Sequence, residues 1–209
     1  MVQEKSEGVM RVRTDERRSA ILQAAAQVFR EVGYDRASMS MIAERVGGSK
    51  TTLYGYFPSK EELFWDAMVA AISAHQGERV LGLLDPTEPD VRKVLTQFGE
   101  AYLRLFTARA VVAVTRTAVS EGATNKALSS LLYNRGPKRV FDAIANYLTQ
   151  LKKRGVVRDI DPHVGAVHLK GLLDAGIIEP LLFGTRPELN QSKAVRAAVD
   201  TFLIAYVRN

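Results

Sequence analysis

The residues of this chain whose types and spacing are best suited to chemistry lie together in one short segment, residues 49–56. Its polar side chains are Ser49, Lys50, Thr51, Thr52, Tyr54 and Tyr56. Hydroxyl groups, ammonium groups and the free amides of a helix N-terminus bond phosphate oxygens, and the leading side chains of such a helix can reach base edges in the major groove. The segment therefore predicts contact with double-stranded DNA.

Two short helices joined by a glycine turn would position these side chains. The hydroxyl of Ser38 can cap the first helix, and Gly47 offers the left-handed residue with which many helices end. Ser49 can then cap a second helix, whose Leu53 and Phe57 point back into a small core. This order of elements predicts a helix-turn-helix, although an ordinary helical hairpin with a polar surface would show the same local pattern.

The sequence on both sides of the glycine turn resembles the DNA-binding domain of TetR (tetracycline repressor) family regulators. The matching segments are DERRSAILQAAAQVFREVGY, SMSMIAERVGGSKTTLYGYF and PSKEELF, at residues 15–34, 38–57 and 58–64. Their order, spacing and turn residues agree with the family over about the first 65 residues. Tyr56 departs from it, because many members carry histidine or another polar residue there, so the base preference of the family does not transfer to this chain.

Part of the remaining chain resembles the effector domain of the AefR-like branch of this family. The matching features are AYLRLFT at residues 101–107, the turn at residues 134–137 and RGVV at residues 154–157. The resemblance implies a homodimer that binds double-stranded operator DNA and a small-molecule effector of unknown identity. Such a protein is usually a repressor that binds a palindromic operator and is released when its effector binds.

Further candidates for DNA contact flank the second helix of the helix-turn-helix. We expect phosphate contacts from Ser38, Ser40, Tyr56 and Lys60, and base or phosphate contacts from Lys50, Thr51, Thr52 and Tyr54. Arg11, Arg13 and Arg17 could reach phosphates or a minor groove. A basic N-terminus that is merely solvated is the alternative for these arginines.

The composition argues against several other classes of protein. The 209 residues include no cysteine, which removes disulfides, thiolate catalysis and the common structural zinc sites. His75, His163 and His168 are dispersed without metal-ligand spacing, and we find no nucleophile–base pair or phosphate-binding glycine loop. We therefore expect no enzyme activity, no cofactor and no metal. The polar first ten residues and the lack of a long apolar stretch predict no signal peptide, no membrane span and a cytoplasmic location.

The net charge of +6 is distributed unevenly along the chain. Residues 1–60 carry ten Lys and Arg against seven Asp and Glu, whereas residues 104–158 carry eleven against two. The helix-turn-helix pattern, rather than the overall charge, therefore carries the DNA-binding prediction. Arg109 and Arg116 share a helical face that would suit an acidic effector if it turned inward, and a solvated face is the simpler alternative.

Helical periodicity dominates the chain and no sustained alternation suggests a sheet, so we expect an all-α fold. A three-helix helix-turn-helix DNA-binding domain with its N-terminal arm would occupy residues 1–60, and a larger helical domain for ligand binding and dimerisation would occupy residues 61–209. Gly33 would end the first helix, and Ser59 would begin a long helix that reaches about Leu84 and couples the domains. Further helices are expected at residues 89–107, 108–121, 124–154 with a break at Gly136 and Pro137, 161–183 and 187–206.

Two sets of residues, most of them apolar, are candidates for functional surfaces. An effector pocket would draw on Trp65, Met68, Phe98, Tyr102, Phe106, Arg109, Arg116, Tyr133 and Phe141. A four-helix dimer interface would draw on Leu169, Leu172, Leu173, Ile177, Val199, Phe202, Leu203 and Tyr206. Packing within one protomer is the alternative for the apolar residues of both sets. The rival functions are a DNA-binding dimer without an effector and a helical ligand-binding protein whose helix-turn-helix is incidental.

Overall fold

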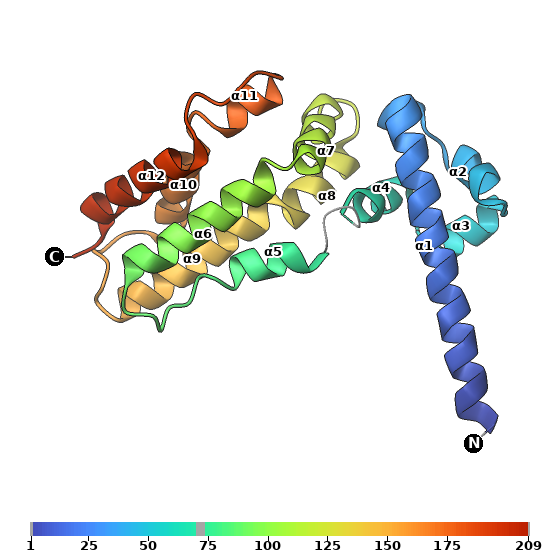
Figure 1. Ribbon diagram of the computed structural model, residues 1–209, viewed down its shortest axis with the longest axis horizontal. Helices are drawn as coiled ribbons and strands as arrows, with labels where there is room; N and C mark the ends of the chain where they lie inside the picture. Colours follow the sequence, from blue (N-terminus) through green and yellow to red (C-terminus); the bar gives the residue numbers. More distant parts are fainter. Residues whose placement is uncertain (1, 70–73, 209) are drawn as a thin grey trace. The chain divides into compact units, whose positions relative to one another are not determined.

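The computed structural model describes residues 2–69 and 74–208, and it describes side chains for residues 14–68 and 76–208 (Figure 1). The described residues form α-helices and turns, with one isolated bridge between Val157 and Val207. They divide into two compact units, residues 1–72 and 73–209. The protein is therefore all-α, with a small N-terminal helix-turn-helix unit and a larger helical unit.

The described part of the first unit, residues 2–69, forms four helices. They are α1 (Val2–Arg36), α2 (Met39–Val46), α3 (Lys50–Tyr56) and α4 (Lys60–Val69). Gly33 leaves the helical conformation with φ 79°, which confirms the expected end of the first helix at this glycine. The rings of Tyr34, directly after Gly33, and Phe64 pack edge to face with their centroids 5.1 Å apart. Phe29, one turn before Gly33, packs against Phe64 at 5.0 Å between centroids. This aromatic cluster joins α1 to α4, so α4 belongs to the first unit and the boundary lies after residue 72 rather than at residue 60.

The expected long helix from Ser59 is described in two parts. The hydroxyl oxygen of Ser59 accepts a hydrogen bond from the amide of Glu62 at 3.1 Å, as an N-terminal cap does. From there α4 runs to Val69, and α5 (Ala74–Leu81) begins the second unit. Residues 70–73 lie outside the described residues, so the continuity of this helix stays a prediction.

The second unit has its core between four longer helices. Its helices after α5 are α6 (Val91–Phe106), α7 (Arg109–Ser120), α8 (Lys126–Arg135), α9 (Pro137–Lys153), α10 (Pro162–Asp174), α11 (Ile178–Leu182) and α12 (Gln191–Tyr206). Helix α10 packs against α6, α9 and α12, and the side chains between them are fully buried. Gly99 of α6 permits this packing, because a Cβ there would lie 2.9 Å from Leu173 Cδ2. Pro137 begins α9 and Gly136 separates it from α8, which confirms the expected break.

The prediction of a single helix over residues 161–183 is wrong. Helix α10 ends at Asp174 and α11 begins at Ile178. Between them Gly176 adopts φ 70°, and its carbonyl oxygen accepts a hydrogen bond from the amide of Glu188 at 2.8 Å. The left-handed glycine therefore turns the chain where a continuous apolar pattern suggested that the helix would go on. Among the described residues, no helix is long and apolar enough to cross a membrane.

Candidate nucleic-acid interface

The turn between α2 and α3 is closed by the caps that its sequence predicts. Ser38 Oγ accepts a hydrogen bond from the amide of Met41 at 3.2 Å and begins α2. Gly47 ends this helix with φ 66°, and the amide of Gly48 donates to the carbonyl oxygen of Ala43 at 2.9 Å. Ser49 Oγ then accepts from the amide of Thr52 at 3.0 Å and begins α3. These local bonds fix where α3 starts and which of its side chains face outward.

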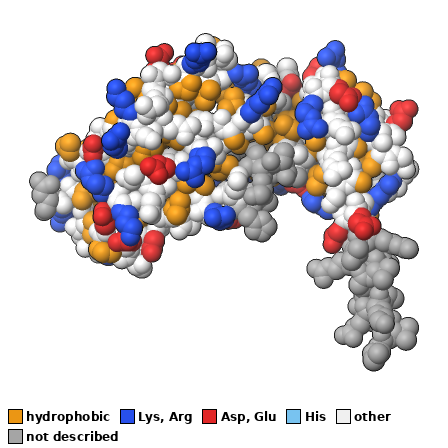
Figure 2. Space-filling view, in the orientation of Figure 1, with side chains coloured by type: hydrophobic (Ala, Val, Ile, Leu, Met, Phe, Trp, Pro, Cys, Tyr) orange, Lys and Arg blue, Asp and Glu red, His pale blue; other side chains and the backbone are white. Residues whose placement is uncertain are grey.

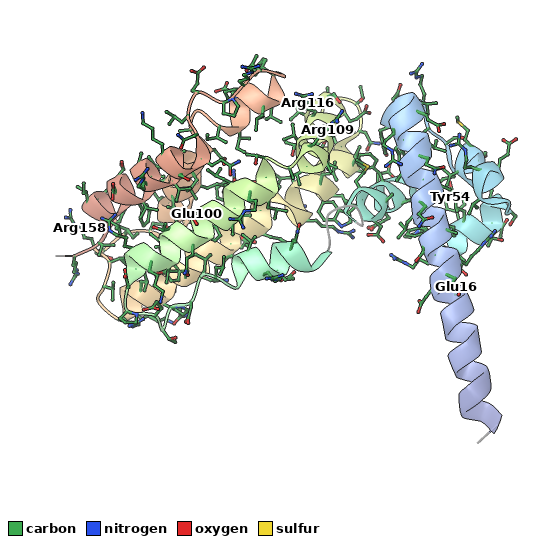
Figure 3. All side chains as sticks on the ribbon, viewed as in Figure 1. Glu16, Tyr54, Glu100, Arg109, Arg116 and Arg158 are labelled. Atoms are coloured by element: carbon green, nitrogen blue, oxygen red, sulfur yellow. The ribbon has the colours of Figure 1, made fainter. Side chains whose placement is uncertain are left out.

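Helix α3 buries one side and exposes the polar side chains of the other. Leu53 and the following Phe57 are buried in the core of the first unit. Lys50, Thr51, Thr52 and Tyr54 are exposed, Tyr56 is half-buried, and Tyr54 extends from α3 as labelled in Figure 3. The ammonium of Lys50 lies 6.0 Å from the centre of the Tyr54 ring, and the hydroxyls of Ser49 and Thr52 lie 2.8 Å apart. Ser40 is exposed and Ser38 half-buried on the neighbouring α2. One surface of the first unit thus carries an ammonium group and several hydroxyls around a helix N-terminus.

Two basic residues expected at the DNA are engaged within the protein. Arg17 donates from Nη2 to the carbonyl oxygen of Gly47 at 3.2 Å. The ammonium of Lys60 donates to the carbonyl oxygens of Tyr34 and Ala37 at 3.0 and 3.1 Å. Both side chains brace the connections on either side of α2, a role that the sequence did not reveal because the partners are backbone atoms at least 23 residues away. Phosphate contacts from Arg17 and Lys60 stay predictions, as do those from Arg11 and Arg13, whose side chains lie outside the described residues.

The structure places seven of the nine candidates for effector binding in the second unit, some in its core and some on its surface. Phe98 and Tyr102 are buried in the core of the second unit, Phe106 and Phe141 are half-buried, and Tyr133 is exposed. Trp65 and Met68 belong to α4 of the first unit. Four of the nine, Phe98, Tyr102, Phe106 and Phe141, do lie near one another. The Tyr102 ring lies 5.9 Å from that of Phe98 and 4.5 Å from that of Phe106, and the ammonium of Lys170 lies near the rings of both Tyr102 and Phe141.

The arginines of α7 lie on a solvated face. Arg109 and Arg116 are both exposed, and Figure 3 shows them on this helix. Arg116 donates from Nη2 to the carbonyl oxygen of Leu181 at 2.5 Å, which links α7 to α11. Figure 2 shows Lys and Arg side chains spread over the visible face of the second unit, with acidic and hydrophobic side chains between them. The inward-facing arrangement that would have suited an acidic effector is therefore absent at these two described residues.

A polar cluster at the end of α10 was not predicted. The hydroxyl of Tyr102 donates to Asp174 Oδ1 at 2.6 Å, and the ammonium of Lys170 lies 2.5 Å from Asp174 Oδ2. Burial, reinforced by the negative charge of Asp174, raises the pKa of the Tyr102 hydroxyl well above its ordinary value, so this group stays a donor. The available signal was Lys170 and Asp174 themselves, a lysine and an aspartate four apart in a mostly apolar helix.

Five of the eight residues expected at a dimer interface lie in the core of a single protomer, and the other three stay predictions. Leu169, Leu173, Ile177, Val199 and Phe202 are buried within the core of their own protomer, and Leu172, Leu203 and Tyr206 are half-buried. The opposite sides of the same two helices carry exposed apolar side chains, with Val164 at 48%, Val167 at 55% and Ile204 at 77% of full exposure. Helix α10 is apolar on two sides, so its sequence pattern alone does not decide which side faces the core, whereas the exposed side of α12 adds Ile204 among polar residues.

An all-α chain with a capped, outward-facing second helix in a helix-turn-helix has the architecture of a DNA-binding transcriptional regulator. Residues 21–67 match the bacterial regulatory proteins of the tetR family, and residues 93–208 match the C-terminal domain of AefR-like transcriptional repressors. This chain belongs to the TetR family of transcriptional regulators.

Individual relatives agree with this assignment. The transcriptional activator FasR of Mycolicibacterium smegmatis is 39% identical over 94 residues, which cover 44% of this chain and 41% of FasR. The chain thus spans about two fifths of the length of the curated relatives that it matches first. Among solved structures, the flavonoid-responsive regulator FrrA is 28% identical with a TM-score of 0.77, over 93% of this chain and 99% of FrrA. A TetR-family regulator from Mesorhizobium loti is 26% identical with a TM-score of 0.76, over 94% of this chain and 99% of the other.

Proposed function

We propose that this protein is a dimeric, ligand-responsive transcriptional repressor that binds a palindromic operator through α3. The observation that carries this proposal is the exposed polar N-terminal turn of α3, whose ammonium and hydroxyl groups suit phosphates and base edges. The caps at Ser38, Gly47 and Ser49 support it, because they hold that turn in one conformation before DNA arrives.

Dimer formation is supported by the outward sides of α10 and α12. We define the paired face as Val164, Val167, His168 and Ile204. The side chains of His168 and Tyr206 are hydrogen-bonded to each other across the two helices, and three of the four residues of the face are exposed aliphatic side chains. A second copy of the chain that covered this face would remove apolar surface from water and supply the second α3 that a palindrome requires.

Effector binding is supported by relatives and by the aromatic residues of the second unit. FrrA, which resembles this chain over nearly its whole length, is described as flavonoid-responsive. The half-buried rings of Phe106 and Phe141, which lie beside the buried Tyr102 and Lys170, suit a flat aromatic molecule. An aromatic effector would release the operator if it bound the DNA-incompetent conformation better than the competent one, and each tenfold preference corresponds to about 1.4 kcal/mol.

A transcriptional activator is the second candidate, because FasR carries that description and shares 39% identity over 94 residues. The two candidates differ in the sign of one measurement. Genome-wide mapping of the sites that the protein occupies would supply the operator, and a reporter placed behind that operator would be measured with and without the regulator. Higher expression without the regulator supports the repressor, and lower expression supports the activator.

The operator itself tests the proposal as a whole. Fluorescence anisotropy with the mapped site and with a scrambled site should show sequence-selective, salt-sensitive binding of two protomers per palindrome. Equal affinity for both sites would contradict the proposal and favour a helical ligand-binding protein. Selective binding that no aromatic compound weakens would favour a DNA-binding dimer without a small-molecule effector.

A further inference from the structure

The second unit holds an ion pair whose two side chains are largely buried. Lys170 and Asp174 face each other on α10, with side chains only 14% and 24% exposed. The other ion pair of the same spacing among the described residues, Lys138 and Asp142 on α9, is 48% and 47% exposed. Removing two charges from water is costly, and a hydrophobic pair at such a site is often as stable or more stable. The Lys170–Asp174 pair is therefore a candidate for a functional role.

Aromatic rings surround one side of this ion pair. The ammonium of Lys170 lies 5.1 Å from the centre of the Phe141 ring on α9 and 5.9 Å from that of Tyr102 on α6. The Tyr102 ring in turn lies 4.5 Å from Phe106, which is half-buried like Phe141. Three helices thus contribute to one cluster in which flat apolar surfaces adjoin two opposite charges.

The hydrogen bonds within the cluster leave capacity for a ligand. A lysine ammonium has three donors, and among the described residues Lys170 uses one, toward Asp174. Each carboxylate oxygen of Asp174 receives one protein donor and can accept another. A group that both accepts from Lys170 and donates to Asp174 would complete both sets of bonds at once.

We propose that the Lys170–Asp174 pair recognises the phenolic hydroxyl of a neutral aromatic effector. This inference rests on the proposed ligand-responsive function and names the chemical class of its ligand. A phenol carries one O–H donor and acceptor lone pairs on a single oxygen, which matches the two partners. Its ring would lie against Phe106 and Phe141, continuing the stacking that begins at Tyr102.

The charge balance of the cluster selects against ionic ligands. The pair is neutral in sum, so a carboxylate would leave two negative groups facing one ammonium, and an amine would leave two positive groups facing one carboxylate. An uncompensated charge at a largely buried position is strongly unfavourable. A neutral hydroxyl adds charge-assisted hydrogen bonds without creating such an excess.

Three flavones that differ at one position test this proposal by calorimetric titration at pH 7. We expect 4′-hydroxyflavone to bind the wild-type protein at least about tenfold more tightly than flavone, which lacks the hydroxyl, and more tightly than flavone-4′-carboxylate. In the Lys170→Met/Asp174→Asn variant the preference for the hydroxyl should fall to about threefold or less, while flavone itself still binds. The matched Lys138→Met/Asp142→Asn variant should keep the wild-type preference, because that exposed pair has the same spacing on α9.

Several results would overturn the proposal. They are an unchanged hydroxyl preference in the Lys170→Met/Asp174→Asn variant, tighter binding of the carboxylate than of the hydroxyflavone, and no binding of any of the three flavones to the wild-type protein. Fluorescence anisotropy with operator DNA, measured on the same preparations without ligand, tests the regulator proposal separately from the proposal that Lys170 and Asp174 recognise a phenol. Selective DNA binding with no hydroxyl preference would leave the regulator proposal standing and end this inference.

Discussion

The guanidinium of Arg17 on α1 lies 3.2 Å from the carbonyl oxygen of Gly47, the residue that ends α2. The same side chain reaches the carbonyl oxygen of Val46 at 3.4 Å. Gly48 makes room for this contact, since a Cβ at that residue would lie 2.6 Å from Arg17 Nη2. The two glycines of the turn thus serve different purposes: Gly47 adopts a left-handed conformation, and Gly48 lets α1 hold the turn that precedes α3.

Arg17→Ala should destabilise the first unit by about 1 kcal/mol, because two carbonyl oxygens lose a charged donor. Trp65 is the only tryptophan of the chain and lies in α4 of that unit, so its fluorescence during urea unfolding reports the change. Arg30→Ala on the exposed side of α1 is the matched control and should unfold like the wild-type protein. Identical midpoints for the two variants would contradict the bracing role of Arg17.

The parts of the fold that were predicted correctly depend on neighbours in the sequence. The caps at Ser38 and Ser49 and the left-handed glycines at residues 33 and 47 act within a few residues, and local spacing reveals them. The contact between Arg17 and Gly48 was not predicted, because the two residues are 31 positions apart in the sequence and meet only when α1 packs beside the turn after α2. The local pattern therefore located α3 but could not reveal that Arg17 braces the turn before it.

The second unit shows the same limit more clearly. Helix α10 carries apolar residues on the side that packs into the core and again on the side that bears Val164 and Val167. Periodicity identified the helix, but only the packing of α6, α9 and α12 decides which side is buried. For the same reason the cluster of Tyr102, Lys170 and Asp174 could not be assembled from the sequence, since α6 and α10 meet only in the fold.

Lys50→Ala should weaken binding to operator and scrambled DNA alike, because an exposed ammonium at the start of α3 suits a phosphate rather than a base. If Lys50 neutralises one phosphate, the slope of log affinity against log salt should become less steep by about 0.9. Anisotropy titrations at several salt concentrations measure both quantities. An unchanged slope together with a loss confined to the operator would instead assign Lys50 to base recognition.

Thr52→Ala should change sequence preference more than affinity for scrambled DNA. The Thr52 hydroxyl lies 2.8 Å from Ser49 Oγ, so its position is fixed on the exposed turn, where it can present a hydrogen-bonding group and a methyl group to base edges. Competition between half-site variants should reveal an altered preference at one or two base pairs. Thr51→Ala serves as the neighbouring comparison, and equal half-site profiles for Thr52→Ala and the wild type would remove Thr52 from the reading surface.

Ile204→Arg should break the proposed dimer, because it introduces a charge into the part of the paired face that lies on α12. Light scattering coupled to size-exclusion chromatography should show a shift from dimer to monomer at the same protein concentration. Val119→Arg is the matched control, since Val119 is an exposed aliphatic residue at 70% exposure but lies on α7. A dimer that survives Ile204→Arg and dissociates with Val119→Arg would move the interface to α7.

Asp85→Asn should reduce the stability of the second unit at neutral pH and lose this effect in acid. Thr87 donates from its hydroxyl and its amide to Asp85 Oδ1 at 2.7 and 2.8 Å, and these bonds lower the pKa of the carboxyl group below its ordinary value. A lowered pKa in the folded state stabilises the protein above the pKa of the unfolded chain, which is about 3.9, and this contribution disappears as the pH falls through the folded value. Thermal melts of the wild type and the variant should therefore differ at pH 7 and begin to converge only as the pH falls below about 4. The control variant is Glu100→Gln, which removes a charge from the exposed side of α6 (Figure 3). Its melting temperature should not show a pH-dependent difference from that of the wild type. A difference between Asp85→Asn and wild type that persists unchanged into acid would show that the hydrogen bonds to Thr87 do not depend on the charge of the carboxylate.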